Sequence, residues 1–366
     1  MTDGASANPV PMPRDSRGIL LPPGVVLDAH EKTSCRLRCC SGDWVAAPSR
    51  ARPLPAGLFR RAALFVVVVR LLVSPIGAKD PAAADRHLSE RLPLFAYDRT
   101  AGFALEEKAV SDRGGVRVRD VSFLAIPGSA DGRTAGFIVT PTAGVRRPCA
   151  GVLWVHWLGA PATTNRTQFL EEAVNLARHG VVSVLVDAMW AKPKWYASRV
   201  LEVDYANSIR QVVALGRAMD LLRSLPNVDK SRIGFVAHDY GAMYGTIAVA
   251  VHPGVRTCVW IAPTSSLMNW AFFVKKPASM EAYLKQNQVL ELKDYLRATT
   301  GVSAFMQFAG HDEYVSRANA KEYFAAANGP KQTHRYEAAG HEMSAPPEIR
   351  ADRTAWLVRE LDLDQK

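Results

Sequence analysis

The chain has 366 residues, 48% of them apolar, a composition typical of a globular protein that buries one large core or two smaller ones. Its formal net charge is +10, but residues 1–79 alone hold 11 Lys and Arg against 5 Asp and Glu. The remaining 287 residues carry mixed charges with a net of only +4, as on an ordinary solvated surface, so nucleic-acid binding is not expected.

The five cysteines predict neither a zinc site nor a disulfide framework, because no CxxC spacing with matching histidines occurs. Three of them fall in the N-terminal segment. Cys149 and Cys258 each adjoin an apolar run, and we expect both to be buried thiols.

The N-terminal segment, residues 1–79, is expected to be a disordered leader, because most of it is rich in Pro, Arg, Ser and Gly without periodicity. Its apolar run at 60–78 is similar to a secretion signal, with Arg60 and Arg61 in front and Ala78 at a possible cleavage site. Arg70 interrupts the run, which is shorter than the roughly 20 apolar residues of a membrane span. An export signal, a buried or interfacial helix and an unstructured leader stay open, so the protein is cytoplasmic or exported.

The body, residues 80–366, begins with a helical stretch at 81–92 and then two alternating segments at 116–126 and 134–141, separated by a Gly-rich turn. Such a pattern predicts an antiparallel hairpin at a sheet edge.

From residue 150 the pattern changes to continuous apolar runs separated by helical periodicity. The runs predict buried strands, and they lie at 150–156, 181–187, 232–238, 257–262 and 303–310. Helices are predicted at 165–180, with Asn165 as N-cap and Gly180 as C-cap, and at 204–225. Parallel strands need helical crossovers, so one α/β domain is expected.

A sharp strand-to-helix turn follows the strand at 232–238. Its central residue is Asp239, and the small residues Ala237 and Gly241 stand two positions before and after it, where larger side chains would clash. The next residues, 242–252, are helical in pattern, so Asp239 is expected at a helix N-terminus, where backbone N–H groups favour an anion.

Two further residues complete a candidate triad. Asp312 follows the strand at 303–310, with Glu313 as the alternative acid, and His341 follows a further strand at 333–337. The chain order of nucleophile, acid and base is that of the α/β-hydrolase triad.

These motifs resemble the α/β-hydrolase superfamily, and within it the dienelactone-hydrolase-like branch. The segments that carry the resemblance are VLWVHWLG, AHDYGAMYG, GHDEYV and AAGHEM. It implies a mostly parallel sheet with helices on both faces. The interval 264–302 is too short for a large cap, so we expect a small cap or none. His156 takes the place of the histidine in the oxyanion loop, and Trp157 stands where glycine is common.

The aspartate in the turn is similar to the nucleophile of haloalkane dehalogenases, fluoroacetate dehalogenases and epoxide hydrolases, which His238–Gly241 matches residue by residue. The resemblance implies that Asp239 attacks and that His341, oriented by Asp312, activates water. The Tyr240 N–H is the expected oxyanion donor, and Trp157 and His156 are further candidates for the oxyanion or the leaving group.

The chemistry of a carboxylate favours saturated carbon. Attack on an ester would form an anhydride more reactive than the ester, whereas attack on a halide or epoxide forms a persistent alkyl ester. We expect a hydrolase of small-molecule halides or epoxides. A dienelactone-like esterase or lactonase, with Asp239 as base, and a non-catalytic binding protein remain as alternatives. No cofactor is predicted, and no metal, because His238, Asp239, His311 and Asp312 lack a recognised ligand spacing.

Overall fold

The structure is a computed structural model, and it describes residues 87–142, 144–145, 148–160, 165–268 and 276–363. The expected leader at 1–79, with its apolar run at 60–78, lies outside these ranges. Within them, no helix combines the length and the apolar character needed to cross a membrane.

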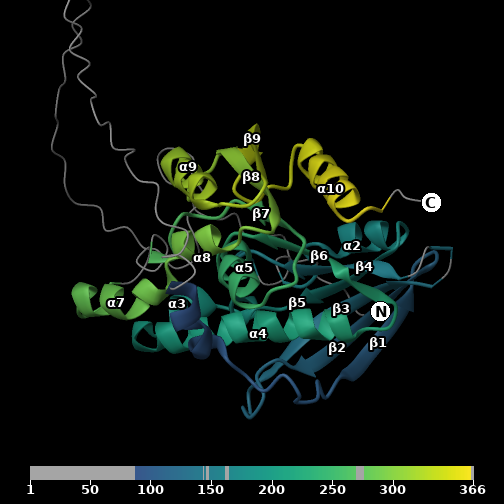
Figure 1. Ribbon diagram of the computed structural model, residues 1–366, viewed down its shortest axis with the longest axis horizontal. Helices are drawn as coiled ribbons and strands as arrows, with labels where there is room; N and C mark the ends of the chain where they lie inside the picture. Colours follow the sequence, from purple (N-terminus) through teal and green to yellow (C-terminus); the bar gives the residue numbers. More distant parts are fainter. Residues whose placement is uncertain (1–86, 143, 146–147, 161–164, 269–275, 364–366) are drawn as a thin grey trace, which may run out of the picture. The chain divides into compact units, whose positions relative to one another are not determined.

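Nine strands form one sheet in the order β1-β2-β3-β5-β4-β6-β7-β8-β9 (Figure 1). The three pairings from β1 to β5 are antiparallel and the other five are parallel, so the expected mostly parallel sheet is confirmed. The strands are β1 (Glu106–Asp112), β2 (Val116–Leu124), β3 (Arg133–Pro141), β4 (Cys149–Val155), β5 (Val181–Val186), β6 (Val228–His238), β7 (Thr257–Ile261), β8 (Ser303–His311) and β9 (Lys331–Gly340).

Helices cover both faces of the sheet, as expected. Residues of α4, α5, α8 and α9 share one hydrophobic core with one face, and residues of α2 and α10 share a second core with the other. The helices are α2 (Leu170–Ala177), α3 (Trp195–Ser198), α4 (Asp204–Ser224), α5 (Tyr240–Val251), α7 (Met280–Asn287), α8 (Leu292–Ala298), α9 (Arg317–Ala326) and α10 (Glu348–Glu360), with 3-10 turns η1 (Leu92–Phe95), η2 (Met189–Ala191), η3 (Leu201–Val203) and η4 (Gln288–Leu290).

The central strands owe their position to continuous apolar sequence. Every residue of β4 and β5 is buried, and so are the last six residues of β6. Strands with this composition are stable only between two layers of helices, because a side chain on either face would otherwise be exposed to water. This placement fixes the C-terminal ends of β4 and β6 as the base of the site described below.

The helix predicted at 165–180 begins later than expected. Asn165 is not an N-cap: its side chain accepts a hydrogen bond from the Thr167 N–H, and α2 starts at Leu170. The preceding residues make tertiary contacts instead. Arg166 pairs with Asp120 and Asp187, and these ion pairs hold the segment out of helical conformation. Nor is Gly180 the C-cap, because α2 ends at Ala177 and Arg178 caps it.

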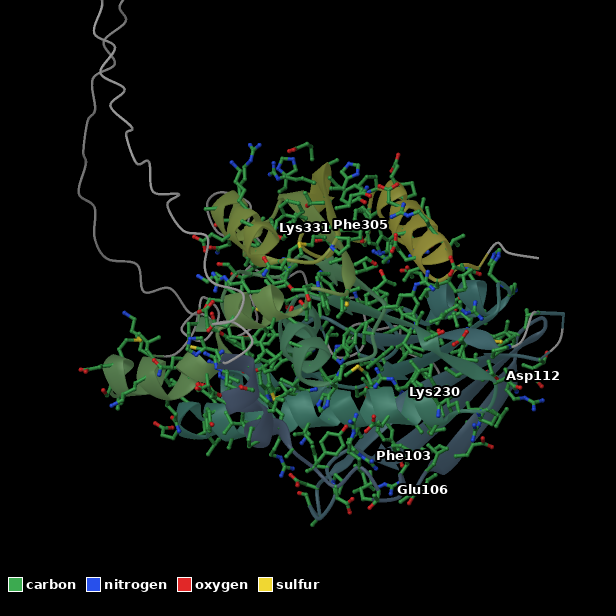
Figure 2. All side chains as sticks on the ribbon, viewed as in Figure 1. Phe103, Glu106, Asp112, Lys230, Phe305 and Lys331 are labelled. Carbon is green, nitrogen blue, oxygen red and sulfur yellow. The ribbon has the colours of Figure 1, made fainter. Side chains whose placement is uncertain are left out.

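Strand β1 was not predicted, because its sequence EEKAVSD shows no apolar alternation. All seven of its residues are exposed. Figure 2 shows the side chains of Glu106 and Asp112, which mark its two ends at the open edge of the sheet. Its carboxylates form ion pairs with arginines of the neighbouring segments; the pairs are Glu107–Arg119, Asp112–Arg117 and Glu106–Arg133.

The connection between β7 and β8 contains α7, η4 and α8 in its described part, and it is too small for a large cap domain. Ser279 caps α7 by accepting the Ala282 N–H, and Tyr283 of α7 donates a hydrogen bond to Asp204 of α4. α8 packs on α5, the helix that follows the sharp turn.

Candidate active site

The turn at Asp239 has the strained conformation that its neighbours predict. Asp239 has φ 52° and ψ −117°, and its N–H donates to the carbonyl of Ile261 at 2.8 Å. A positive φ at a residue other than glycine costs about 1–3 kcal/mol, which the surrounding structure must offset. A Cβ at Gly241 would lie 2.7 Å from the carbonyl oxygens of Val155 and His156, so only glycine permits α5 to approach β4 this closely.

The two carboxylate oxygens of Asp239 have different surroundings. Oδ2 accepts a hydrogen bond from the backbone N–H of Leu158 at 3.2 Å. Oδ1 lies 3.7 Å from His341 Nε2 and has no hydrogen-bond partner within the described part of the chain. Asp239 is 1% exposed. One oxygen is therefore held in place, while the other is directed at the imidazole.

His341 lies between two carboxylates. Its Nδ1 is 2.9 Å from Asp312 Oδ2, and Asp312 is itself fixed by the N–H groups of Tyr314 and Val315. Burial lowers the pKa of His341, but the hydrogen bond to Asp312 and the charges of Asp239 and Asp312 outweigh burial and raise the pKa to about 10. The structure thus brings the three predicted triad residues together, with His341 in the middle.

The loop after β4 supplies the N–H that faces Asp239, and it comes from Leu158. The Trp157 N–H donates instead to Gln168 Oε1 at 2.9 Å. Both ring nitrogens of His156 contact backbone groups: Nε2 accepts a hydrogen bond from the Ala188 N–H at 3.0 Å, and Nδ1 lies 2.8 Å from the Trp157 carbonyl oxygen. Neither ring nitrogen of His156 points to Asp239.

The Trp157 indole lies beside the triad. Its ring stacks on that of His238 at 5.3 Å between centroids and meets His341 edge-on at 5.6 Å. Tyr314 approaches His341 edge-on from another side, at 5.0 Å. Two aromatic rings therefore border the imidazole, and they limit which groups can reach it.

Tyr240 is the first residue of α5, so its N–H belongs to the helix N-terminus, where the backbone donors have no intrahelical acceptor. Its side chain packs into an aromatic cluster with Trp190, Trp195 and Tyr244. Three other aromatic side chains use their polar atoms within the fold: Trp190 Nε1 donates to the His156 carbonyl, Tyr283 Oη donates to Asp204, and Tyr295 Oη donates to the Val289 carbonyl.

Two hollows lie near the start of α5. A cavity of about 20 Å³, enough for one or two waters, is lined by Tyr240 and by the buried pair Arg199 and Asp204. A groove of about 550 Å³ lies between the β2–β3 turn, the loop after β5 and α4. Met189 and Trp195 line both hollows, so these two residues separate the groove from the cavity.

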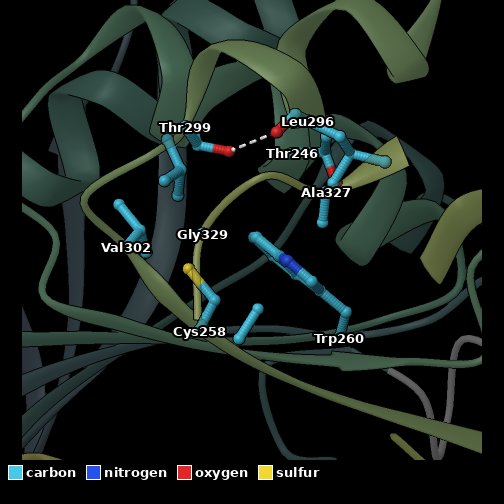
Figure 3. A pocket seen from close by; sticks show the side chains of 10 residues that line it. Thr246, Cys258, Trp260, Leu296, Thr299, Val302, Ala327 and Gly329 are labelled. Atoms are coloured by element: carbon cyan, nitrogen blue, oxygen red, sulfur yellow. Dashed lines mark hydrogen bonds between the residues drawn. The ribbon is translucent and has the colours of Figure 1, made fainter. Parts of the chain in front are cut away.

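A third cavity lies on the other side of α5 and has no contact with the triad. Figure 3 shows it between Thr246, Cys258, Trp260 and the end of α8. It measures about 10 Å³, room for one water at most. Burial raises the pKa of the Cys258 thiol well above its usual value, so the cysteine is a packing residue and not a nucleophile.

Metal binding finds no support among the residues that the structure describes, where no cluster of three or more His, Cys, Asp or Glu side chains could hold an ion. The rings of His238 and His341 are neighbours, 5.5 Å apart between centroids. Both ring nitrogens of His238, however, are occupied by hydrogen bonds to Gln168 and to the His341 carbonyl.

Sequence reasoning missed two residues of the site. Leu158 acts through its backbone N–H, which carries no signal in the side-chain sequence. Gln168 lies before α2 in a segment that was expected to be helical, and only its contacts with Trp157 and His238 reveal its place. The position two residues after His156 was the one available signal for the oxyanion-loop donor.

Comparison with known proteins gives no family model that matches the chain and no match among curated proteins. Solved structures do match. Acetyl xylan esterase 1 from Thermoanaerobacterium sp. JW/SL YS485 aligns with a TM-score of 0.56 and 16% identity, over 78% of this chain and 95% of that one. The acetyl xylan esterase from Paenibacillus sp. R4 aligns with a TM-score of 0.56 and 15% identity, over 78% of this chain and 95% of that one. An S-formylglutathione hydrolase from Agrobacterium tumefaciens aligns with a TM-score of 0.53 and 12% identity, over 70% of this chain and 99% of that one. These likenesses extend over nearly the whole length of each neighbour, and together with the sheet order they establish that the chain has the α/β-hydrolase fold.

Proposed function

We propose that the protein is a hydrolase in which Asp239 attacks the saturated carbon of a small-molecule halide or epoxide. The observation that carries the proposal is that the two carboxylate oxygens of Asp239 have different contacts. Oδ2 is bound by the Leu158 N–H, and Oδ1 is directed at the triad imidazole at 3.7 Å.

This arrangement disfavours an ester as substrate. Acyl transfer requires the oxyanion donors to bind the carbonyl oxygen of the substrate. Here the Leu158 N–H already binds Asp239 itself. In an alkyl-enzyme, the same Oδ2 is the carbonyl oxygen of the new ester, so the donor is correctly placed for the oxyanion that forms when water attacks.

The reaction balances in two steps. In the first, a lone pair of Oδ1 forms a C–O bond and the halide leaves with the electrons of the C–X bond. In the second, His341 takes a proton from water as the water oxygen attacks Cγ of Asp239. The tetrahedral intermediate collapses by breaking the bond between Cγ and the alkylated oxygen, and the imidazolium returns the proton to the alcohol.

The charge of Asp239 couples these steps. The resting His341 is an imidazolium at neutral pH, because two carboxylates raise its pKa to about 10. Alkylation neutralises Asp239, so the pKa of His341 falls and its proton is released, to solvent for a halide or to the alkoxide for an epoxide. The neutral imidazole then serves as the base of the second step.

The test is turnover of haloalkanoates, epoxides and activated esters in oxygen-18 water, followed by mass analysis of the peptide that bears Asp239. We expect one label in that carboxylate after a single turnover and accumulation of the alkyl-enzyme in His341→Gln. Ester turnover without label would favour Asp239 as a base, as in the dienelactone-like alternative. No turnover of any substrate would favour the non-catalytic alternative.

A further inference from the structure

A chain of hydrogen bonds runs beside the triad through two residues that the mechanism has not used, Gln168 and His238. The Trp157 N–H donates to Gln168 Oε1 at 2.9 Å. Gln168 Nε2 lies 2.9 Å from His238 Nδ1, and His238 Nε2 lies 2.9 Å from the carbonyl oxygen of His341. The chain therefore links the loop after β4, the end of β6 and the loop after β9.

The direction of every bond follows from its first member. A backbone N–H can only donate, so the side-chain atom of Gln168 that it meets is the carbonyl oxygen. The amide nitrogen then faces His238 and donates to Nδ1. Since Nδ1 accepts, the single proton of a neutral His238 lies on Nε2, which donates to the His341 carbonyl.

His238 stays neutral in this position. It is completely buried, and burial is the main reason that its pKa is held well below the usual value. The charges of His341, Arg353 and His156 act in the same direction, while the hydrogen bond to the His341 carbonyl opposes them. These hydrogen bonds are thus made by uncharged groups at neutral pH, where His341 is protonated.

Both ends of the chain adjoin reacting groups. Trp157 precedes Leu158, whose N–H binds Asp239 Oδ2, and the accepting carbonyl belongs to the residue that carries the catalytic imidazole. We propose that Gln168 and His238 are positioning residues, which hold the Leu158 N–H and the His341 backbone in register with Asp239. The catalytic consequence rests on the proposed function, whereas the structural one does not.

Removal of the link gives a specific kinetic signature. In Gln168→Leu the Trp157 N–H and His238 Nδ1 both lose their partner, so the Leu158 N–H is no longer fixed. We expect kcat to fall by about 10–100-fold with little change in KM, since loss of a whole oxyanion donor costs about 10²–10³-fold. The alkyl-enzyme should accumulate, because its hydrolysis places the oxyanion on Oδ2.

Gln168→Glu adds a pH signature that a purely structural loss would not give. A carboxylate has no N–H to offer, so the link to His238 forms only when the pair takes up one extra proton. We therefore expect near wild-type kcat at low pH and a loss as pH rises, on top of the wild-type profile. Gln332→Glu, at an exposed position on β9, is the control with the same change of charge.

A readout without turnover tests the placement itself. The amino-acid sequence contains two positions where Leu directly follows Trp, Trp157–Leu158 and Trp356–Leu357. Labelling Trp carbonyls with carbon-13 and Leu amides with nitrogen-15 therefore selects two amide signals. Leu357 is buried in α10 and serves as an internal reference. In Gln168→Leu we expect amide exchange at Leu158 to accelerate at least tenfold relative to Leu357, with no change in Gln332→Leu.

The outcomes separate this inference from the proposed function. An unchanged Leu158 amide in Gln168→Leu overturns the inference whether or not the protein turns over a substrate. A changed amide with unchanged kcat overturns the catalytic part. A wild-type protein without turnover contradicts the proposed function, and the amide measurement still decides the placement.

Discussion

Replacing Asp239 with asparagine removes the charge that lies 3.7 Å from His341 Nε2 and keeps the shape of the side chain. With an effective dielectric constant of about 20, two unit charges at this separation interact by about 4.5 kcal/mol. That energy corresponds to about 3 pKa units. The pKa of His341 is about 10 in the wild type, so we expect about 7 in Asp239→Asn.

The measurement is a pH titration of the histidine ring signals by NMR, with His341→Gln identifying the signal of His341. Asp312 remains in the variant, and its hydrogen bond to Nδ1 keeps the ring in place. A fall of less than about one unit would refute the reasoning, because Asp239 would then not control the charge of the imidazole and the coupling of the two chemical steps would be lost.

Four further predictions concern the triad, the turn at Asp239 and a buried ion pair between Arg353 and Glu172. Asp312→Asn should lower kcat by about 10³–10⁴-fold with KM little changed, since His341 loses the group that fixes its tautomer. The free energy of unfolding should decline by about 1.4 kcal/mol per pH unit from about pH 6.5 to 10. The reason is that protonated His341 stabilises the fold below this window, and this stabilisation is lost as the pH rises to the pKa of His341 in the folded protein. Urea titrations at pH 7 and 9 measure the decline. Gly241→Ala should cost about 2 kcal/mol or more in the same assay, through the clash with β4, and a smaller cost would contradict the close approach. Arg353→Met should cost about 3–5 kcal/mol by leaving Glu172 buried without its bidentate partner, and adding Glu172→Leu should recover part of it.

The sequence predicted the parts of the fold that depend on composition and local geometry. The continuous apolar runs of β4 and β5 indicated strands buried on both faces, and the small residues around Asp239 indicated the sharp turn. The triad order was visible because Asp312 and His341 both follow recognisable strands.

What escaped prediction depends on contacts between distant segments. The start of α2 is displaced because Arg166 finds carboxylates on β2 and after β5, and no local pattern encodes them. The Leu158 donor is a backbone group, and one hydrogen bond of Gln168 joins it to His238, 70 positions away in the sequence. Strand β1 was missed because it is held by backbone pairing with β2 and by ion pairs of exposed side chains, neither of which leaves an apolar periodicity.

The side-chain contacts of β1, which are ionic and add to its backbone pairing with β2, have a mechanical consequence. Its three ion pairs join side chains that are largely exposed, and each such pair contributes only about 0–1 kcal/mol and weakens with salt. The sheet is therefore expected to fray from this side first as ionic strength rises, while the fully buried strands beyond it stay paired. The charged side chains along this outer strand, Glu106, Glu107, Lys108 and Asp112, also oppose edge-to-edge aggregation, because charged residues on an open edge disfavour pairing with another strand.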